Sequence, residues 1–188
     1  MTGSKRRAVF LDRDGTLNVE VDYLGDPERF EWIPGTLDAL SDLHAAGFQL
    51  VVITNQSGVA RGYFTEDDVA RVHDRMCADL AQRGIELAGI YYCPFHPDVG
   101  EPPYRKDADC RKPKPGMFLQ ALRELDIDAE QSFCVGDSAR DLEAGRAAGI
   151  SGILVATGKG ASMQDKVPTG TPYVPDLAHA AQWILARA

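Results

Sequence analysis

The sequence predicts an α/β protein with a doubly wound, mostly parallel sheet, helices on both faces and no separate cap domain. Short apolar runs alternate with longer segments of helical periodicity along the chain. The runs are continuously apolar, which is typical of parallel strands buried on both faces. Several runs end abruptly in polar turns, and ligand sites of such sheets lie beyond the carboxyl ends of the strands.

The first half of the chain supplies three strands and two helices. The runs RAVFL and FQLVVIT read as short buried strands. Thr65 is a good N-cap followed by acidic residues, and Gly47 and Gly84 follow the predicted helices as C-terminal caps. In order, we expect a strand at 7–11, a helix at 36–47, a strand at 48–54, a helix at 65–84 and a strand at 87–93.

The second half begins with a long loop that is rich in proline and polar residues. Pro115 then suits the first turn of a helix, where its missing N–H costs nothing. In order, we expect a loop at 94–114, a helix at 115–125, a strand at 132–136, a helix at 138–149, a strand at 151–157, a short strand around Tyr173 and a last helix at 176–188.

The length of 188 residues suits a single domain covering 1–188. Only 17–35 and 94–114 are long enough to be loop insertions, and neither could fold alone. The composition is 44% hydrophobic, and the net charge of −8 argues against nonspecific nucleic acid or membrane binding. No signal-peptide core or membrane-spanning run is present, and four cysteines fit free thiols in a reducing cytoplasm. Monomer is the default expectation.

Polar residues leave three of the predicted strands at the edge where a site is expected. Asp12 and Asp14 follow the first strand, Thr54 ends the second, and Asp137 follows the strand at 132–136. Several carboxylates that converge at strand ends need a cation, and oxygen ligands suit Mg²⁺. Lys112, just before a helix, supplies a second positive charge.

These residues resemble the four motifs of phosphatases of the haloacid dehalogenase (HAD) superfamily: DRDGT at 12–16, Thr54, Lys112 and GDSARD at 136–141. The resemblance implies a Rossmann-like sheet. FLDRDGTLN, VVITNQSGVARGYF, GIYYCPFHP and CRKPKPGM are further similar to the heptose bisphosphate phosphatase branch. The sister branch of histidinol-phosphate phosphatases typically has TNQDG where this chain has TNQSG.

The chemistry of the two acids follows from their order. Asp12, first at the strand end, is placed to attack phosphorus and form an aspartyl phosphate. Asp14 then serves as general acid for the leaving sugar oxygen and as general base for water. The resemblance implies that Mg²⁺ is held by Asp12, Asp137 and the backbone carbonyl of Asp14. Thr54 and Lys112 would hold the phosphoryl oxygens.

Substrate contacts come from loops in this interpretation. The resemblance implies that Asn55, Gln56 and Ser57 contact phosphate, although they would also suit a plain turn. It also implies that Arg111 binds the sugar or a second phosphate, and that the stretch Glu20, Val21, Asp22 and Tyr23 lines the sugar pocket rather than only covering it.

Several residues have open roles. Asp141 either binds the metal through water, orients its loop or caps its helix. His44, His73 and His179 fall in predicted helices and are expected at the surface or its boundary.

The loop at 94–114 contains only part of a zinc-site pattern. In the resembling branch this loop often carries Cys-x-His, a gap and Cys-x-Cys. Cys93 and Cys110 match, but Phe95 and Ala108 stand at the other two ligand positions, and His96 is one position off. A structural Zn²⁺ needs four ligands, so we expect a zinc-free loop with the two thiols close together.

The resemblance implies a cytoplasmic, Mg²⁺-dependent phosphatase that removes the C7 phosphate of a heptose 1,7-bisphosphate, a small phosphosugar. The first alternative is a histidinol-phosphate phosphatase or another small-molecule phosphomonoesterase. The second is a noncatalytic phosphosugar-binding module, which the intact acids and Lys112 disfavour.

Overall fold

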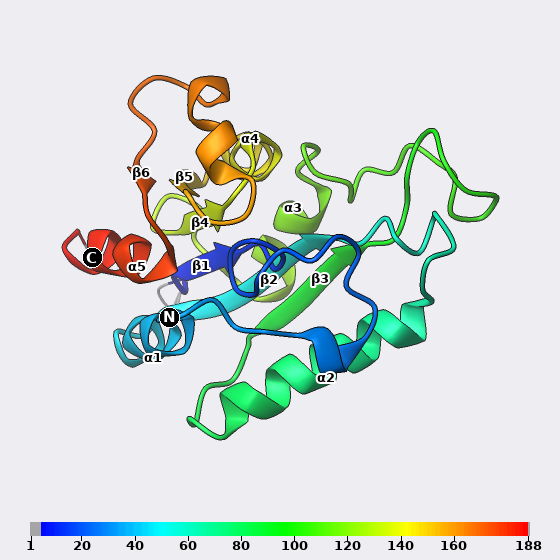
Figure 1. Cartoon of the computed structure of the whole chain (residues 1–188). Helices are drawn as coiled ribbons and strands as arrows, with labels where there is room; N and C mark the ends of the chain where they lie inside the picture. Colours follow the sequence, from blue (N-terminus) through cyan, green and yellow to red (C-terminus); the bar gives the residue numbers. More distant parts are fainter. Residues whose placement is uncertain (1–4, 188) are drawn as a thin grey trace.

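The computed structural model describes residues 5–187 and contains a six-stranded sheet between two layers of helices (Figure 1). The strand order is β3-β2-β1-β4-β5-β6, and all neighbouring strands pair in parallel. The predicted doubly wound sheet is confirmed, and it is entirely parallel where we expected a mostly parallel one. The strand order changes direction between β1 and β4, which is where a doubly wound sheet places its ligand site.

The predicted strands and helices are all present, with ends that differ by a few residues. Helix ends differ most, because the last predicted turns give way to irregular turns, and Ala188 lies outside the described residues. Three short 3-10 helices were not predicted. The elements are β1 (Ala8–Leu11), η1 (Pro27–Arg29), α1 (Thr36–Ala45), β2 (Gln49–Asn55), α2 (Glu66–Ala81), β3 (Gly89–Cys93), α3 (Gly116–Glu124), β4 (Phe133–Gly136), α4 (Ala139–Ala147), β5 (Ser151–Val155), η2 (Gly160–Ser162), η3 (Gln164–Lys166), β6 (Tyr173–Val174) and α5 (Leu177–Leu185).

The two faces of β1 show why the sheet is covered on both sides. Val9 and Leu11 pack in one apolar cluster with side chains of α1, α2 and α5. Ala8 and Phe10 pack in a second cluster with side chains of α3 and α4. Alternate residues of a strand point to opposite faces, and all four are fully buried. The continuous apolar run therefore serves two cores at once.

The 17–35 segment contains η1 and is otherwise irregular, and the 94–114 segment contains none of the helices or strands given above. Figure 1 shows the 17–35 segment passing in front of the sheet and the 94–114 segment extending beyond β3. Within 5–187 no helix combines the length and apolar character that a membrane crossing needs.

Candidate active site

The DRDGT motif forms a tight turn at the end of β1. The backbone N–H of Asp12 still donates to the Val135 carbonyl of β4 (3.0 Å), so Asp12 leaves the sheet between two strands. The carbonyl of Arg13 then accepts from the N–H of Leu17 (2.8 Å), which closes the turn. The Arg13 N–H donates to Asp12 Oδ1 (2.8 Å) and fixes the carboxylate. The turn thus presents Asp12 at the carboxyl edge of the sheet.

Three carboxylates converge at this edge. Asp12, Asp137 and Asp141 each offer an oxygen, and these oxygens lie within 4.8 Å of one another. The Asp137 carboxylate fits only because two glycines lie against it: a Cβ would come within 2.3 Å of its Oδ2 at Gly15 and within 2.1 Å at Gly158. Closely packed carboxylate oxygens are the ligands that Mg²⁺ prefers. The residues present therefore fit the predicted metal.

The pKa values of the acidic cluster also favour a bound cation. Burial, and after it the negative charge of Asp141, raise the pKa of Asp12 to about 8, although the Lys112 ammonium acts in the opposite direction. Burial also raises the pKa of Asp137 to about 6, against a hydrogen bond from the Lys159 N–H. Both carboxyls are held in a site that disfavours their charged form, and a divalent cation would relieve that repulsion.

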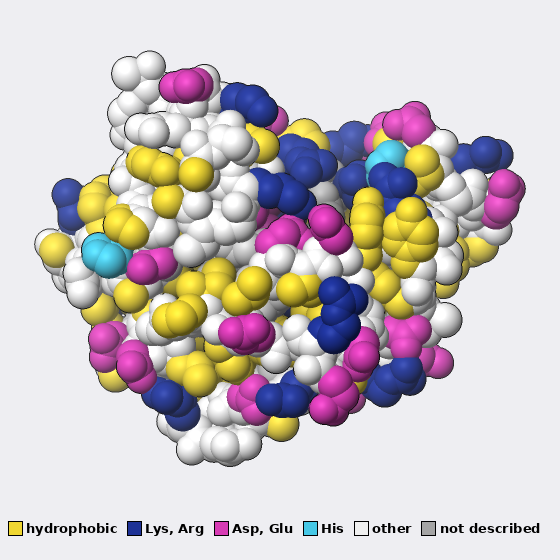
Figure 2. Space-filling model, in the orientation of Figure 1, with side chains coloured by type: hydrophobic (Ala, Val, Ile, Leu, Met, Phe, Trp, Pro, Cys, Tyr) yellow, Lys and Arg dark blue, Asp and Glu magenta, His cyan; other side chains and the backbone are white. Residues whose placement is uncertain are grey.

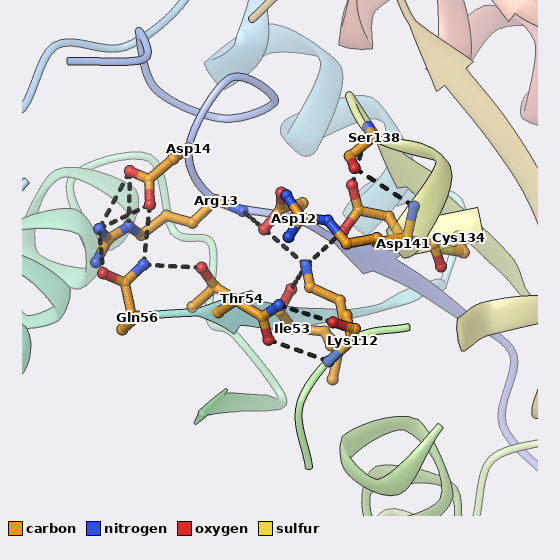
Figure 3. A network of polar contacts seen from close by, with 12 residues as sticks. Asp12, Arg13, Asp14, Ile53, Thr54, Gln56, Lys112, Cys134, Ser138 and Asp141 are labelled. Atoms are coloured by element: carbon orange, nitrogen blue, oxygen red, sulfur yellow. Dashed lines mark hydrogen bonds and ion pairs between the residues drawn. The ribbon is translucent and has the colours of Figure 1, made fainter. Parts of the chain in front are cut away.

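Lys112 lies at the centre of the site and is almost fully buried (Figure 3). Its Nζ lies 2.9 Å from Asp12 Oδ1 and 2.6 Å from Asp141 Oδ1, and it donates to the Ile53 carbonyl at 2.7 Å. Burial lowers the pKa of Lys112, but the two carboxylates together raise it above its ordinary value. Lys112 is therefore a fixed positive charge beside the predicted nucleophile.

Asp141 has one of the three roles that the sequence left open, the helix cap, and it also pairs with Lys112. Its Oδ2 accepts from the Ser138 N–H (3.0 Å), and the two residues form a capping box at the start of α4. Its Oδ1 pairs with Lys112. Asp141 therefore caps its helix and holds the lysine, while its carboxylate also belongs to the acidic cluster.

Asp14 faces away from the acidic cluster (Figure 3). Arg13 Nη2 donates to both of its oxygens at 3.1 and 2.9 Å, Gln56 Nε2 donates at 2.9 Å, and Asn18 Nδ2 donates at 3.1 Å. Burial would raise the pKa of Asp14, but Arg13 and these hydrogen bonds hold it below its usual value. Asp12 and Asp14 are two residues apart, and their pKa values shift in opposite directions because Asp12 is buried in the acidic cluster while Asp14 is paired with Arg13.

Two amide side chains support the site instead of reaching into it. Gln56 is buried and bonds to Asp14, Thr54 Oγ1 (2.9 Å) and Arg13. Asn55 donates to the Lys112 carbonyl and accepts from its N–H, both at 3.1 Å. Both residues border the cavity, and their amide groups already have protein partners, so the phosphate contacts expected of these residues stay a prediction.

A cavity of about 290 Å³ opens above these residues. Ser57, Glu20, Asp22 and Tyr23 line it, as the sequence predicted, and Figure 2 shows acidic side chains in a hollow with Lys and Arg side chains beside it. The prediction for Val21 was wrong. Val21 packs against the apolar core under the loop, because this is where its aliphatic side chain escapes water.

The basic side of the cavity was only partly predicted. Arg111 lines it and donates to the Phe95 carbonyl (3.0 Å), but Arg61, Arg140 and Lys159 line it as well. Burial, and then the positive charges of Arg140 and Arg61, lower the pKa of Arg111. Like charges that share a partly buried cavity favour an anion between them. Arg61 and Arg140 lie within the motifs GVARGYF and GDSARD, so their positions in these motifs could have identified them as cavity residues.

The loop at 94–114 brings Cys110 close to Cys93 at the end of β3, as predicted. The Sγ atoms of Cys93 and Cys110 lie 3.1 Å apart. Phe95 and Ala108, which stand at the two unmatched zinc positions, pack against the second apolar cluster. His96 borders the cavity, and its Nδ1 accepts from the Asp98 N–H (3.1 Å).

His73 is not at the surface, contrary to our expectation. It is buried on α2, and its Nε2 lies 3.2 Å from Arg13 Nη1. Only the packing of α2 against the DRDGT turn reveals this contact, since the two residues are 60 positions apart.

A parallel sheet with an acidic cluster, a buried lysine and a DxD turn at its switch point defines a HAD-like phosphatase. A family model described as HAD-hydrolase-like matches residues 109–180. The chain is 52% identical over 155 residues to the D-glycero-β-D-manno-heptose-1,7-bisphosphate 7-phosphatase of Pasteurella multocida, which covers 82% of this chain and 84% of that protein. It is 45% identical to the enzyme of the same name from Escherichia coli K12, over 95% of this chain and 87% of that protein.

Solved structures agree with these relatives. The D,D-heptose 1,7-bisphosphate phosphatase from B. bronchiseptica, crystallised with magnesium and phosphate, superposes with a TM-score of 0.88 at 38% identity, covering 97% of this chain and 99% of that one. The enzyme of that name from Burkholderia thailandensis gives a TM-score of 0.72 at 31% identity, covering 96% and 99%. The chain therefore belongs to the heptose bisphosphate phosphatase family of HAD-like hydrolases, and it is a phosphatase.

Proposed function

We propose that this chain removes the C7 phosphate of D-glycero-D-manno-heptose 1,7-bisphosphate and releases heptose 1-phosphate, a precursor of ADP- or GDP-activated heptose for lipopolysaccharide or a related glycan. One observation carries the proposal: a single cavity is lined both by the acid–lysine cluster and by Arg61, Arg111 and Arg140. The first group suits a phosphate that reacts, and the second suits a phosphate that remains on the product.

In the first half-reaction, an Asp12 carboxylate oxygen attacks phosphorus and the bond between phosphorus and the C7 oxygen breaks. Asp14, once protonated, donates its proton to the leaving oxygen, so that the sugar departs as an alcohol. Lys112 stabilises the negative charge near Asp12, and the Thr54 hydroxyl is positioned by Gln56 at the same edge.

In the second half-reaction, the Asp14 carboxylate accepts a proton from water while the water oxygen attacks phosphorus. The bond between phosphorus and Asp12 breaks, which releases inorganic phosphate and restores the Asp12 carboxylate. Mg²⁺, held by Asp12, Asp137 and the Asp14 backbone carbonyl, would supply positive charge that lowers the repulsion between nucleophile and phosphate.

Two features support this substrate over histidinol phosphate. Histidinol phosphate carries one phosphate, which leaves the three arginines without a matching anion. The chain also has TNQSG at 54–58, as the heptose branch does. The relatives are named for the β anomer, and we infer the same preference here.

Phosphate release with Mg²⁺ tests the proposal on both anomers of the heptose 1,7-bisphosphate, fructose 1,6-bisphosphate and histidinol phosphate. We expect the largest kcat/KM for the β-heptose bisphosphate and no turnover by Asp12→Asn, whose amide is not a nucleophile. A larger kcat/KM for histidinol phosphate would reject the proposed substrate. Near-normal turnover by Asp12→Asn would reject the covalent mechanism.

A further inference from the structure

Arg13 is a fully buried arginine whose side chain the proposed mechanism does not use. Its Nε and Nη2 bond to the Asp14 carboxylate at 2.9–3.2 Å, and Nη2 also donates to Gln56 Oε1 at 3.0 Å. Removing a guanidinium from water is unfavourable unless well-placed hydrogen-bond acceptors compensate for the lost hydration. One of the partners that compensate for the burial of Arg13 is Asp14, the predicted general acid and base.

The remaining end of the guanidinium meets α2. Arg13 Nη1 lies 3.2 Å from His73 Nε2, and His73 is only 7% exposed. A guanidinium has only donors, so Nε2 must accept, and the ring proton then lies on Nδ1. Burial and the Arg13 charge lower the pKa of His73 to about 3, which keeps the ring neutral. Tyr92 of β3 packs edge-on against this ring, with centroids 5.8 Å apart.

The result is a continuous chain of contacts from α2 to the reacting edge of the sheet. His73 fixes one end of the guanidinium, and the planar fork at the other end fixes both oxygens of Asp14. Gln56 accepts a hydrogen bond from Arg13 and donates hydrogen bonds to Asp14 and Thr54. A residue needed only to fill this space would be apolar, because apolar residues pack there at no cost in buried charge.

We propose that Arg13 is a positioning residue for proton transfer, which holds the Asp14 carboxylate in one orientation, and that His73 holds Arg13 in place. This inference rests on the proposed role of Asp14. Proton transfer requires heavy atoms within hydrogen-bond reach, and a misplacement of about 1 Å costs roughly 10²-fold in rate. Loss of Arg13 should therefore slow those reactions in which the leaving group needs a proton.

The test compares kcat/KM, which reports the steps through phosphoryl transfer, for two substrates. The heptose bisphosphate releases its C7 oxygen, an alkoxide that needs a proton, whereas p-nitrophenyl phosphate releases a stable phenolate that needs none. We expect Arg13→Met to lower kcat/KM by about 10²-fold for the sugar and by about threefold or less for the aryl phosphate. Asp14→Asn is the reference and should show the same selectivity with a loss of about 10²–10⁴-fold on the sugar.

The possible results distinguish the proposed role of Asp14 from that of Arg13. If Asp14→Asn slows both substrates equally, the proposed role of Asp14 fails, and the role of Arg13 fails with it. If Asp14→Asn is selective but Arg13→Met slows both substrates equally, the role of Arg13 is overturned and that of Asp14 stands.

Substitutions of His73 test the positioning role of Arg13 even if Arg13→Met does not fold. His73→Leu removes the acceptor and should lower kcat/KM for the sugar about tenfold, with little change for the aryl phosphate. His73→Gln restores an acceptor oxygen and should recover most of that loss. His44→Leu, at an exposed histidine of α1, is the matched control and should match the wild type. Equal kcat/KM values for His73→Leu and His73→Gln would overturn the inference.

Discussion

Because His73 is buried in its neutral form, we expect it to make the unfolding free energy depend on pH. His73 has a pKa of about 3 in the folded protein and about 6.5 when the chain is unfolded. Between these values the unfolded state binds a proton that the folded state does not bind. Stability is therefore unaffected by His73 above about pH 6.5, and it falls as the pH drops below that value.

The magnitude follows from the two pKa values. Lowering the pH from 7 to 5 stabilises the unfolded state through His73 by about 2 kcal/mol. In His73→Gln this contribution is absent, while an acceptor for Arg13 is retained. The raised pKa values of Asp12 and Asp137 act in the opposite direction, because their folded forms bind the extra proton, and both variants share them.

Urea unfolding, followed by tryptophan fluorescence at pH 7 and pH 5, measures the effect. We expect the wild type to lose about 2 kcal/mol more of its unfolding free energy than His73→Gln does between these two pH values. His44→Gln should lose as much as the wild type. Equal losses in the wild type and His73→Gln would show that His73 does not remain neutral in the folded protein.

Three further predictions concern the lysine, the basic cavity and the cysteines. Asp141→Ala should lower the unfolding free energy by about 1.5–3 kcal/mol, because it removes a buried charged hydrogen bond and leaves Asp12 as the remaining carboxylate partner of Lys112, whereas Ser138→Ala should cost only about 1 kcal/mol for a lost cap; equal values in urea unfolding would contradict this. Arg111→Ala should lower kcat/KM for a bisphosphate about 10- to 100-fold more than for a monophosphate, and equal losses would limit Arg111 to the reacting phosphate or the fold. Elemental analysis of protein purified without chelator should find no stoichiometric zinc, and near-stoichiometric zinc that is lost in Cys110→Ser would overturn that expectation.

The sequence alone determined the sheet, the order of its elements and the motif residues at the strand ends. These features depend on local patterns: continuous apolar runs must be buried on both faces, and an N-cap such as Thr65 fixes where a helix begins. Parallel strands bring their carboxyl ends to one edge, so the meeting of Asp12 and Asp137 followed from the fold class, whereas the place of Lys112 was implied only by the resemblance to the family motifs.

The tertiary structure alone decided which partner each polar side chain takes. Arg13 contacts His73, which is 60 positions away in the sequence, and Asn55 bonds to the backbone of Lys112, which is 57 positions away. Val21 packs against the apolar core. Such contacts depend on how distant segments pack and on the direction of each side chain, and no local pattern encodes either. The acids and the lysine of the site could therefore be named from the sequence, whereas Arg61, Arg140 and Lys159 of the cavity and the contacts that orient the acids became visible only in the folded structure.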